Sequence, residues 1–147
     1  MAERRLSIYS GPPIEAALAC IADEENRSGR LNTICDRYLA MVADELGRLD
    51  LSKDEWCAIM DANNGVTVFY GEPAGLTATG IWANVHDSPE LGEKWKIDQA
   101  ALVGKLQRLP RSTLLAVQEA CDRFWSRTEQ PTDKALAASG IKPRKLT

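Results

Sequence analysis

The stretch Arg5-Leu6-Ser7-Ile8-Tyr9, followed by Ser10-Gly11-Pro12-Pro13, decides the fold at the front of this chain. Along residues 5–9 apolar side chains alternate with polar ones, so a strand here presents Leu6 and Ile8 on one face. The glycine and the two prolines end the strand, and a proline near the first helical position favours a helix from about Pro13. A strand this short is not stable alone, so it is expected to pair with another strand.

Two runs with helical spacing follow. The first covers residues 13–25. The second is expected to open at Ser28 as N-cap and to close at Gly47 as C-cap. Its apolar stripe consists of Leu31, Ile34, Cys35, Tyr38, Leu39, Val42 and Leu46. A unit of fewer than about fifty residues does not bury such stripes alone and usually oligomerises, so the sequence predicts an intertwined dimer.

The pattern becomes specific at residues 22–28, which read Ala-Asp-Glu-Glu-Asn-Arg-Ser and precede a helix that carries Ile34 and Tyr38. Over residues 4–46 it resembles the ribbon-helix-helix family, to which the Arc and MetJ repressors belong. The resemblance implies a homodimer in which two chains pair their strands antiparallel. It also implies that this ribbon enters the major groove of double-stranded DNA.

The same resemblance implies which residues contact DNA. By position, the base contacts are Arg5, Ser7 and Tyr9. Arginine can bridge O6 and N7 of guanine, a serine hydroxyl serves either base type, and tyrosine can donate or stack. The family also clamps a phosphate on the amides that open its second helix, where the helix dipole favours an anion. The phosphate contacts implied here are Arg4, Arg27, Ser28, Gly29 and Arg30.

Charge and composition set limits on this interpretation. The 147-residue chain has a formal charge of −3, so no global positive field favours nucleic acid. Non-specific DNA affinity should therefore be low and fall steeply with salt. Local basic clusters occur at Arg4 and Arg5 and at residues 142–145. No apolar run approaches the ~20 residues of a membrane helix, which predicts a cytoplasmic protein without a membrane partner.

The cysteine pattern gives no sign of a metal or redox site. The four cysteines stand at positions 20, 35, 57 and 121, without the two-residue spacing of a zinc knuckle or redox pair. They are expected to be reduced thiols in the core. With His86 as the single histidine, the sequence predicts no metal and no cofactor.

The rest of the chain predicts a mainly α protein of three parts. Residues 1–48 form the ribbon-helix-helix domain, residues 49–127 a small helical bundle, and residues 128–147 a short helix with a mobile basic tail. A capping box, Ser52 with Glu55, opens the first bundle helix, which stops at Asn63-Asn64-Gly65. Further helices are expected at about 77–86, 98–109, 111–125 and 133–139, a short strand at 66–70, and a common core around the tryptophans at 56, 82, 95 and 125.

No catalytic constellation is present in the sequence, so we do not expect an enzyme. There is no Gly-rich phosphate loop and no serine elbow, and Asp54 with Glu55 fits acids at a helix start. The expected function is a dimeric, sequence-specific DNA-binding protein of prokaryotic type, either a transcriptional repressor or a plasmid-type accessory factor. A higher assembly on DNA and a protein partner of the C-terminal part stay open. Two alternatives remain: an antitoxin whose C-terminal part binds a toxin, and an all-helical protein-binding module without DNA binding.

Overall fold

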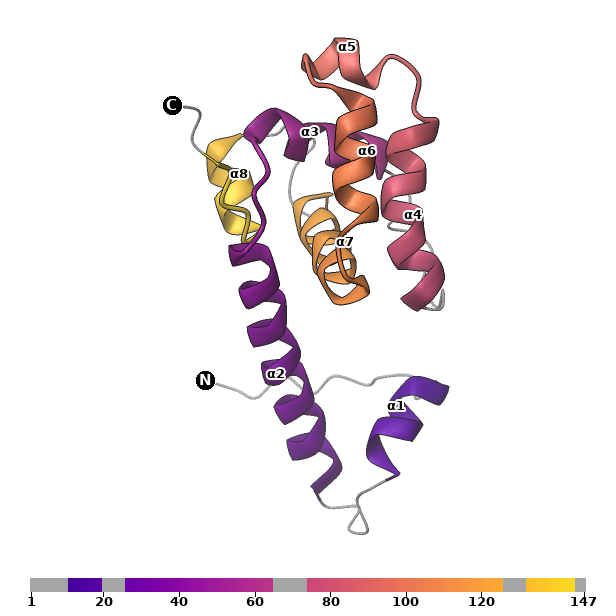
Figure 1. The fold of residues 1–147 in the computed structure, drawn as a ribbon. Helices are drawn as coiled ribbons and strands as arrows, with labels where there is room; N and C mark the ends of the chain where they lie inside the picture. The colour runs from indigo at the N-terminus through magenta and orange to yellow at the C-terminus, as the bar shows by residue number, and fades with distance from the viewer. Residues whose placement is uncertain (1–10, 20–25, 65–73, 126–131, 145–147) are drawn as a thin grey trace. The chain divides into compact units, whose positions relative to one another are not determined.

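The computed structural model describes residues 11–19, 26–64, 74–125 and 132–144. Within these ranges the chain is mainly α-helical, with eight helices and no strand (Figure 1), as the predicted fold class requires at that level. The strands predicted at residues 5–9 and 66–70 lie outside the described residues. The chain divides into two compact units, residues 1–39 (unit 1) and residues 40–147 (unit 2).

Unit 1 contains helix α1 (Pro12–Leu18) and the first part of α2 (Arg27–Gly47). α1 begins at the paired prolines, as predicted, after an extended Gly11 at the N-cap. The helix ends at Leu18, earlier than the expected end near residue 25, and residues 20–25 are not described. No residue of α1 is buried, although three of its apolar side chains are partly covered.

α2 is a continuous helix of 21 residues that belongs to both units. Its end at Gly47 agrees with the predicted C-terminus, but its start corrects one prediction. The helix begins at Arg27, so Ser28 lies inside its first turn and is not the N-cap. The division between the two compact units falls within α2.

Unit 2 packs the last turns of α2 with six further helices. Their bounds are α3 (Lys53–Ala62), α4 (Ala74–Asp87), α5 (Leu91–Trp95), α6 (Gln99–Gln107), α7 (Arg111–Trp125) and α8 (Asp133–Ala138). α4 contacts both α6 and α7, and α3 contacts α4 and α5. The largest fully buried side chains are Trp56, Phe124, Leu51, Ile59, Met60, Ile81, Leu102, Leu106, Leu136, Ile141, Val85 and Val117. The predicted helices are therefore present here, with α5 as an addition and α4 longer than expected.

Side-chain caps explain why several of these helices begin where the sequence predicts. Ser52 Oγ accepts from the Glu55 N–H at 3.2 Å, and a Glu55 carboxylate oxygen accepts from the Ser52 N–H at 2.8 Å, which confirms the capping box of α3. Asp98 caps α6 by accepting from the Ala101 N–H at 3.0 Å. Because these caps satisfy amides that lack partners inside the helix, each fixes the first residue of its helix.

The end of the described chain is packed, which corrects the expectation of a mobile tail for residues 140–144. α8 ends in a turn where Gly140 has a φ of 82° and the Ile141 N–H donates to Leu136 O at 3.0 Å. This turn directs Ile141 into the core, where it is 1% exposed. The Arg144 N–H then donates to Leu51 O at 2.8 Å.

The cysteine prediction is correct for two positions and wrong for one. Cys57 and Cys121 are buried, and burial raises the pKa of the Cys57 thiol to about 11 and that of Cys121 to about 12. Cys35 is exposed on α2. Cys20 lies outside the described residues. Among the described tryptophans, Trp56 is in the core, and Trp82 and Trp95 pack partly against it.

No helix in the described part of the chain has the length and apolar character needed to cross a membrane.

Candidate nucleic-acid interface

The first turn of α2 carries the predicted phosphate contacts that the structure describes. Arg27, Ser28 and Gly29 are exposed and consecutive, and they occupy the first three positions of the helix. In an α-helix the amides of the first turn have no intrahelical acceptor and face outward along the axis. The structure thus places Arg27, Ser28 and Gly29 where backbone amides can bind an anion. Arg4, Arg5, Ser7 and Tyr9 lie outside the described residues.

Gly29 leaves open space at this turn. A Cβ built on Gly29 meets no atom within 4 Å. The residue is exposed and helical, so neither packing nor backbone conformation requires a glycine there. The Gly29 carbonyl accepts from Thr33 Oγ1 at 3.0 Å, which fixes the end of the turn. A glycine without a folding role at a helix start fits the close approach of a ligand.

Arg30 differs from its neighbours because it is only partly exposed. Its Nε atom is buried and has no hydrogen-bond partner in the described structure. A buried donor without an acceptor costs about 1–3 kcal/mol. A phosphate or carboxylate that reached this side chain would remove that cost.

A second feature of α2 is an apolar face that is covered at one end only. Val42 and Leu46, in the last turns, are each 3% exposed because they join the core of unit 2. Tyr38, Leu39 and Met41 are 42%, 50% and 60% exposed. These three residues are the exposed large hydrophobic side chains of the described chain, and with the exposed Cys35 they form what we call the open face of α2.

The open face differs slightly from the predicted stripe. Met41 was not part of that stripe, although it lies two turns after Ile34 and one turn after Tyr38, on the same side of the helix. A stricter use of the helical period would have included it. Leu31 and Ile34 belong to the stripe and are partly covered.

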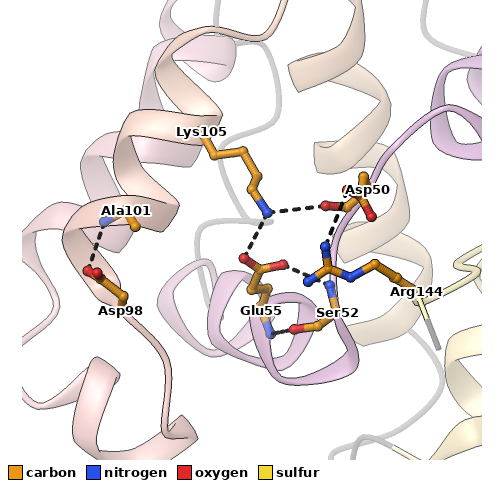
Figure 2. A network of polar contacts seen from close by, with 7 residues as sticks. All are labelled: Asp50, Ser52, Glu55, Asp98, Ala101, Lys105 and Arg144. Atoms are coloured by element: carbon orange, nitrogen blue, oxygen red, sulfur yellow. Dashed lines mark hydrogen bonds and ion pairs between the residues drawn. The ribbon is translucent and has the colours of Figure 1, made fainter. Parts of the chain in front are cut away.

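Unit 2 contains a polar network whose members satisfy one another (Figure 2). Lys105 Nζ donates to Glu55 Oε1 at 2.9 Å and to the Asp50 carbonyl oxygen at 3.2 Å. Arg144 pairs with the Asp50 carboxylate at 3.3 Å. Burial alone would raise the pKa of Glu55, but the hydrogen bonds from Lys105 and from the Ser52 backbone outweigh it and hold that pKa below its usual value. This network joins the loop after α2 to α3, α6 and the chain end, which is a structural role.

A neighbouring pair at α3 and α5 has the same character. Asp61 accepts from Lys94 Nζ at 2.7 Å and from Trp95 Nε1 at 3.0 Å. Burial raises the pKa of Asp61, and these two hydrogen bonds lower it by more, so the net shift is downward. A shallow pocket of about 410 Å³ lies beside Asp61 and Lys94, but both groups are already paired. Among the described residues, no group of three or more His, Cys, Asp or Glu side chains gathers as a metal site.

No family model, curated protein or solved structure matches this chain. We infer a function from the first turn of α2 and from its open face.

Proposed function

We propose that this chain is a dimeric, sequence-specific DNA-binding protein of the ribbon-helix-helix type. Two copies pair the strand predicted at residues 5–9 and place Arg5, Ser7 and Tyr9 in the major groove. The first turn of α2 in each copy, at Arg27, Ser28 and Gly29, then holds a backbone phosphate beside the groove. A repressor or a plasmid-type accessory factor would use the same contacts.

The open face of α2 is the observation that carries this proposal. One amphipathic helix has its last turns buried in a core while its preceding turns expose Tyr38, Leu39 and Met41 to water. Contiguous exposed apolar side chains of this kind mark an interaction surface. A second copy of the same helix supplies an apolar face of matching length, which is the arrangement that a dimer of short strand-and-helix units needs.

The first turn of α2 supports the nucleic-acid part of the proposal. Exposed amides, an unpaired Arg30 Nε and a glycine with no folding role lie within four consecutive residues. Each of them is compatible with an anion at the helix start. The packed core of unit 2 counts against the antitoxin alternative, because antitoxin tails order on binding.

The test is selection of duplexes from random DNA at ~100 mM salt with the full chain, repeated with Arg5→Ala and Tyr9→Ala. We expect the wild type to enrich a palindromic motif and both variants to lose it. Arg37→Ala is the matched control, because Arg37 is exposed on α2 and its loss changes the net charge by the same amount as the loss of Arg5. If the wild type enriches no motif, or if both ribbon variants select the same motif as the wild type, the proposal is wrong.

A further inference from the structure

Two exposed arginines flank the turn between α6 and α7, and a third follows the end of α2. Arg108 is the C-cap of α6, Arg111 is the first residue of α7, and Arg48 follows the end of α2. All three are exposed, and all three belong to unit 2. We call them the basic corner; in Figure 1 the turn between α6 and α7 is in the orange part of the chain.

Short hydrogen bonds fix the backbone of this corner. Thr113 Oγ1, in the first turn of α7, donates to Glu45 Oε2 near the end of α2 at 2.6 Å. The turn between the helices closes as the Leu109 N–H donates to Leu106 O and the Leu114 N–H to Pro110 O, both at 3.1 Å. The end of α2 is thereby held beside the start of α7.

Among the described residues the side chains of the basic corner have no acidic partner, a property that they share with the exposed Lys96, Lys134 and Lys142. The ion pairs that involve lysine or arginine in unit 2 are Lys53–Asp133, Lys94–Asp61, Lys105–Glu55, Arg123–Glu119 and Arg144–Asp50. In the described structure Arg48, Arg108 and Arg111 make no side-chain hydrogen bond or ion pair. Glu45 accepts a hydrogen bond from Thr113, but this neutral donor leaves its negative charge in place. Glu45 and the exposed Asp44, one turn before Arg48, therefore both offset part of the positive charge.

Charge is separated along α6. Acidic residues Asp87, Glu90, Glu93 and Asp98 lie before its first residue, whereas Arg108 and Arg111 follow its last. A helix of nine residues is about 14 Å long, more than one Debye length at physiological salt. Three arginines against Asp44 and Glu45 leave the basic corner with a positive balance although the chain as a whole is acidic.

We propose that the basic corner is a second DNA contact surface, which binds backbone phosphates independently of sequence. This inference rests on the proposed DNA-binding function and extends it to unit 2. Arginine is suited to this role because its planar guanidinium binds phosphate oxygens in a bidentate manner. Phosphate contacts of this kind supply affinity and register while the ribbon supplies specificity. They explain how a chain with a net charge of −3 binds a polyanion.

The test is fluorescence anisotropy with the full chain, using the selected duplex and an unrelated duplex of equal length between ~50 and ~200 mM salt. The variant is Arg48→Gln with Arg108→Gln and Arg111→Gln. If three phosphate contacts are lost from each chain of the dimer, the slope of log K against log salt falls by about 5.4, from about 0.9 per contact. The wild type should then lose about 2,000-fold more affinity than the variant across this salt range. Asp44→Asn should strengthen binding to both duplexes.

The control is Lys96→Gln with Lys134→Gln and Lys142→Gln, which removes the same charge from exposed positions elsewhere in unit 2. Circular dichroism verifies that each variant is folded. The inference predicts a reduced salt slope and an unchanged selected motif for the arginine variant, and a smaller effect for the lysine control.

Three results would overturn the inference. If the arginine variant behaves like the lysine control while the wild type still selects its motif, the basic corner is not a DNA contact and the proposed function stands. If the arginine variant selects a different motif, the corner reads bases and not the backbone. A wild type that binds neither duplex refutes the proposed function together with this inference.

Discussion

Truncation of the open face of α2 should weaken the dimer by about three orders of magnitude. Complete burial of a Leu or Met side chain stabilises by about 1.5–3 kcal/mol. Leu39 is 50% exposed and Met41 60% exposed in the single chain, so covering the remainder contributes about 1 kcal/mol for each. In a symmetric dimer each substitution acts twice, so Leu39→Ala with Met41→Ala removes about 4 kcal/mol, or about 10³ in the dissociation constant.

Sedimentation equilibrium over a range of protein concentrations measures this change. Alanine retains the helix propensity of α2, and neither side chain belongs to the core of unit 2, so that unit should keep its helical signal. Thr33→Ala with Asp36→Ala is the control, because both residues are exposed on the side of α2 opposite Tyr38. A wild type that is monomeric at high micromolar concentration, or a variant that dimerises as tightly as the wild type, would refute the reasoning.

Three further predictions concern single positions. Gly29→Ala should stabilise the protein by up to about 1 kcal/mol in thermal unfolding, since the added Cβ has space in the free chain. The same substitution should weaken DNA binding in fluorescence anisotropy, because the Cβ would meet a phosphate bound at the amides of this turn. Equal DNA affinity of variant and wild type would exclude a phosphate there. The pKa of Glu55 is lower in the folded state than in the unfolded chain, so its contribution to stability is present above the ordinary pKa of glutamate and is lost as the pH falls through the folded-state value. Denaturant titrations from neutral to acidic pH should therefore show a weaker acid dependence of stability for Glu55→Gln than for the wild type. Identical pH profiles of the two proteins would contradict this prediction. Ile141→Ala should lower the free energy of unfolding in urea by about 2–5 kcal/mol, whereas substitution of the exposed Lys142 by alanine should change it little. A negligible effect of Ile141→Ala would mean that this end of the described chain is not part of the core.

Local signals in the sequence were sufficient to locate most helices of unit 2. The Ser52–Glu55 capping box, Asp98 as an N-cap and Pro110 before α7 each act within one turn, so a linear sequence contains the information. The same reasoning missed α5, a single turn between two residues with positive φ, Glu90 and Lys96. Glutamate and lysine do not predict a positive φ, since residues other than glycine rarely adopt it. The burial of Leu91 between them is a tertiary contact that the local sequence does not show.

Burial of the α2 stripe could not be predicted from periodicity, because periodicity identifies an apolar face but not what covers it. Cys35 and Val42 occupy the same stripe, yet one is exposed and the other is 3% exposed. The difference depends on contacts with residues far along the chain. The same limit applies to the contact between the end of α2 and the start of α7, since Glu45 and Thr113 are far apart in the sequence.

The junction between Leu51 and Arg144 has a kinetic consequence. The Asp50–Arg144 ion pair joins residues 94 positions apart, and the neighbouring backbone bond and the burial of Ile141 close the same loop. Closing a loop of that length lowers the conformational entropy of the chain before the contacts at its ends can form, so such contacts form late in folding. Helices α3 to α7 can therefore associate early, and the last step in the folding of unit 2 is the contact between residues 141–144 and the loop that follows α2. Variants at Ile141 should on this account mainly accelerate unfolding and leave the folding rate nearly unchanged.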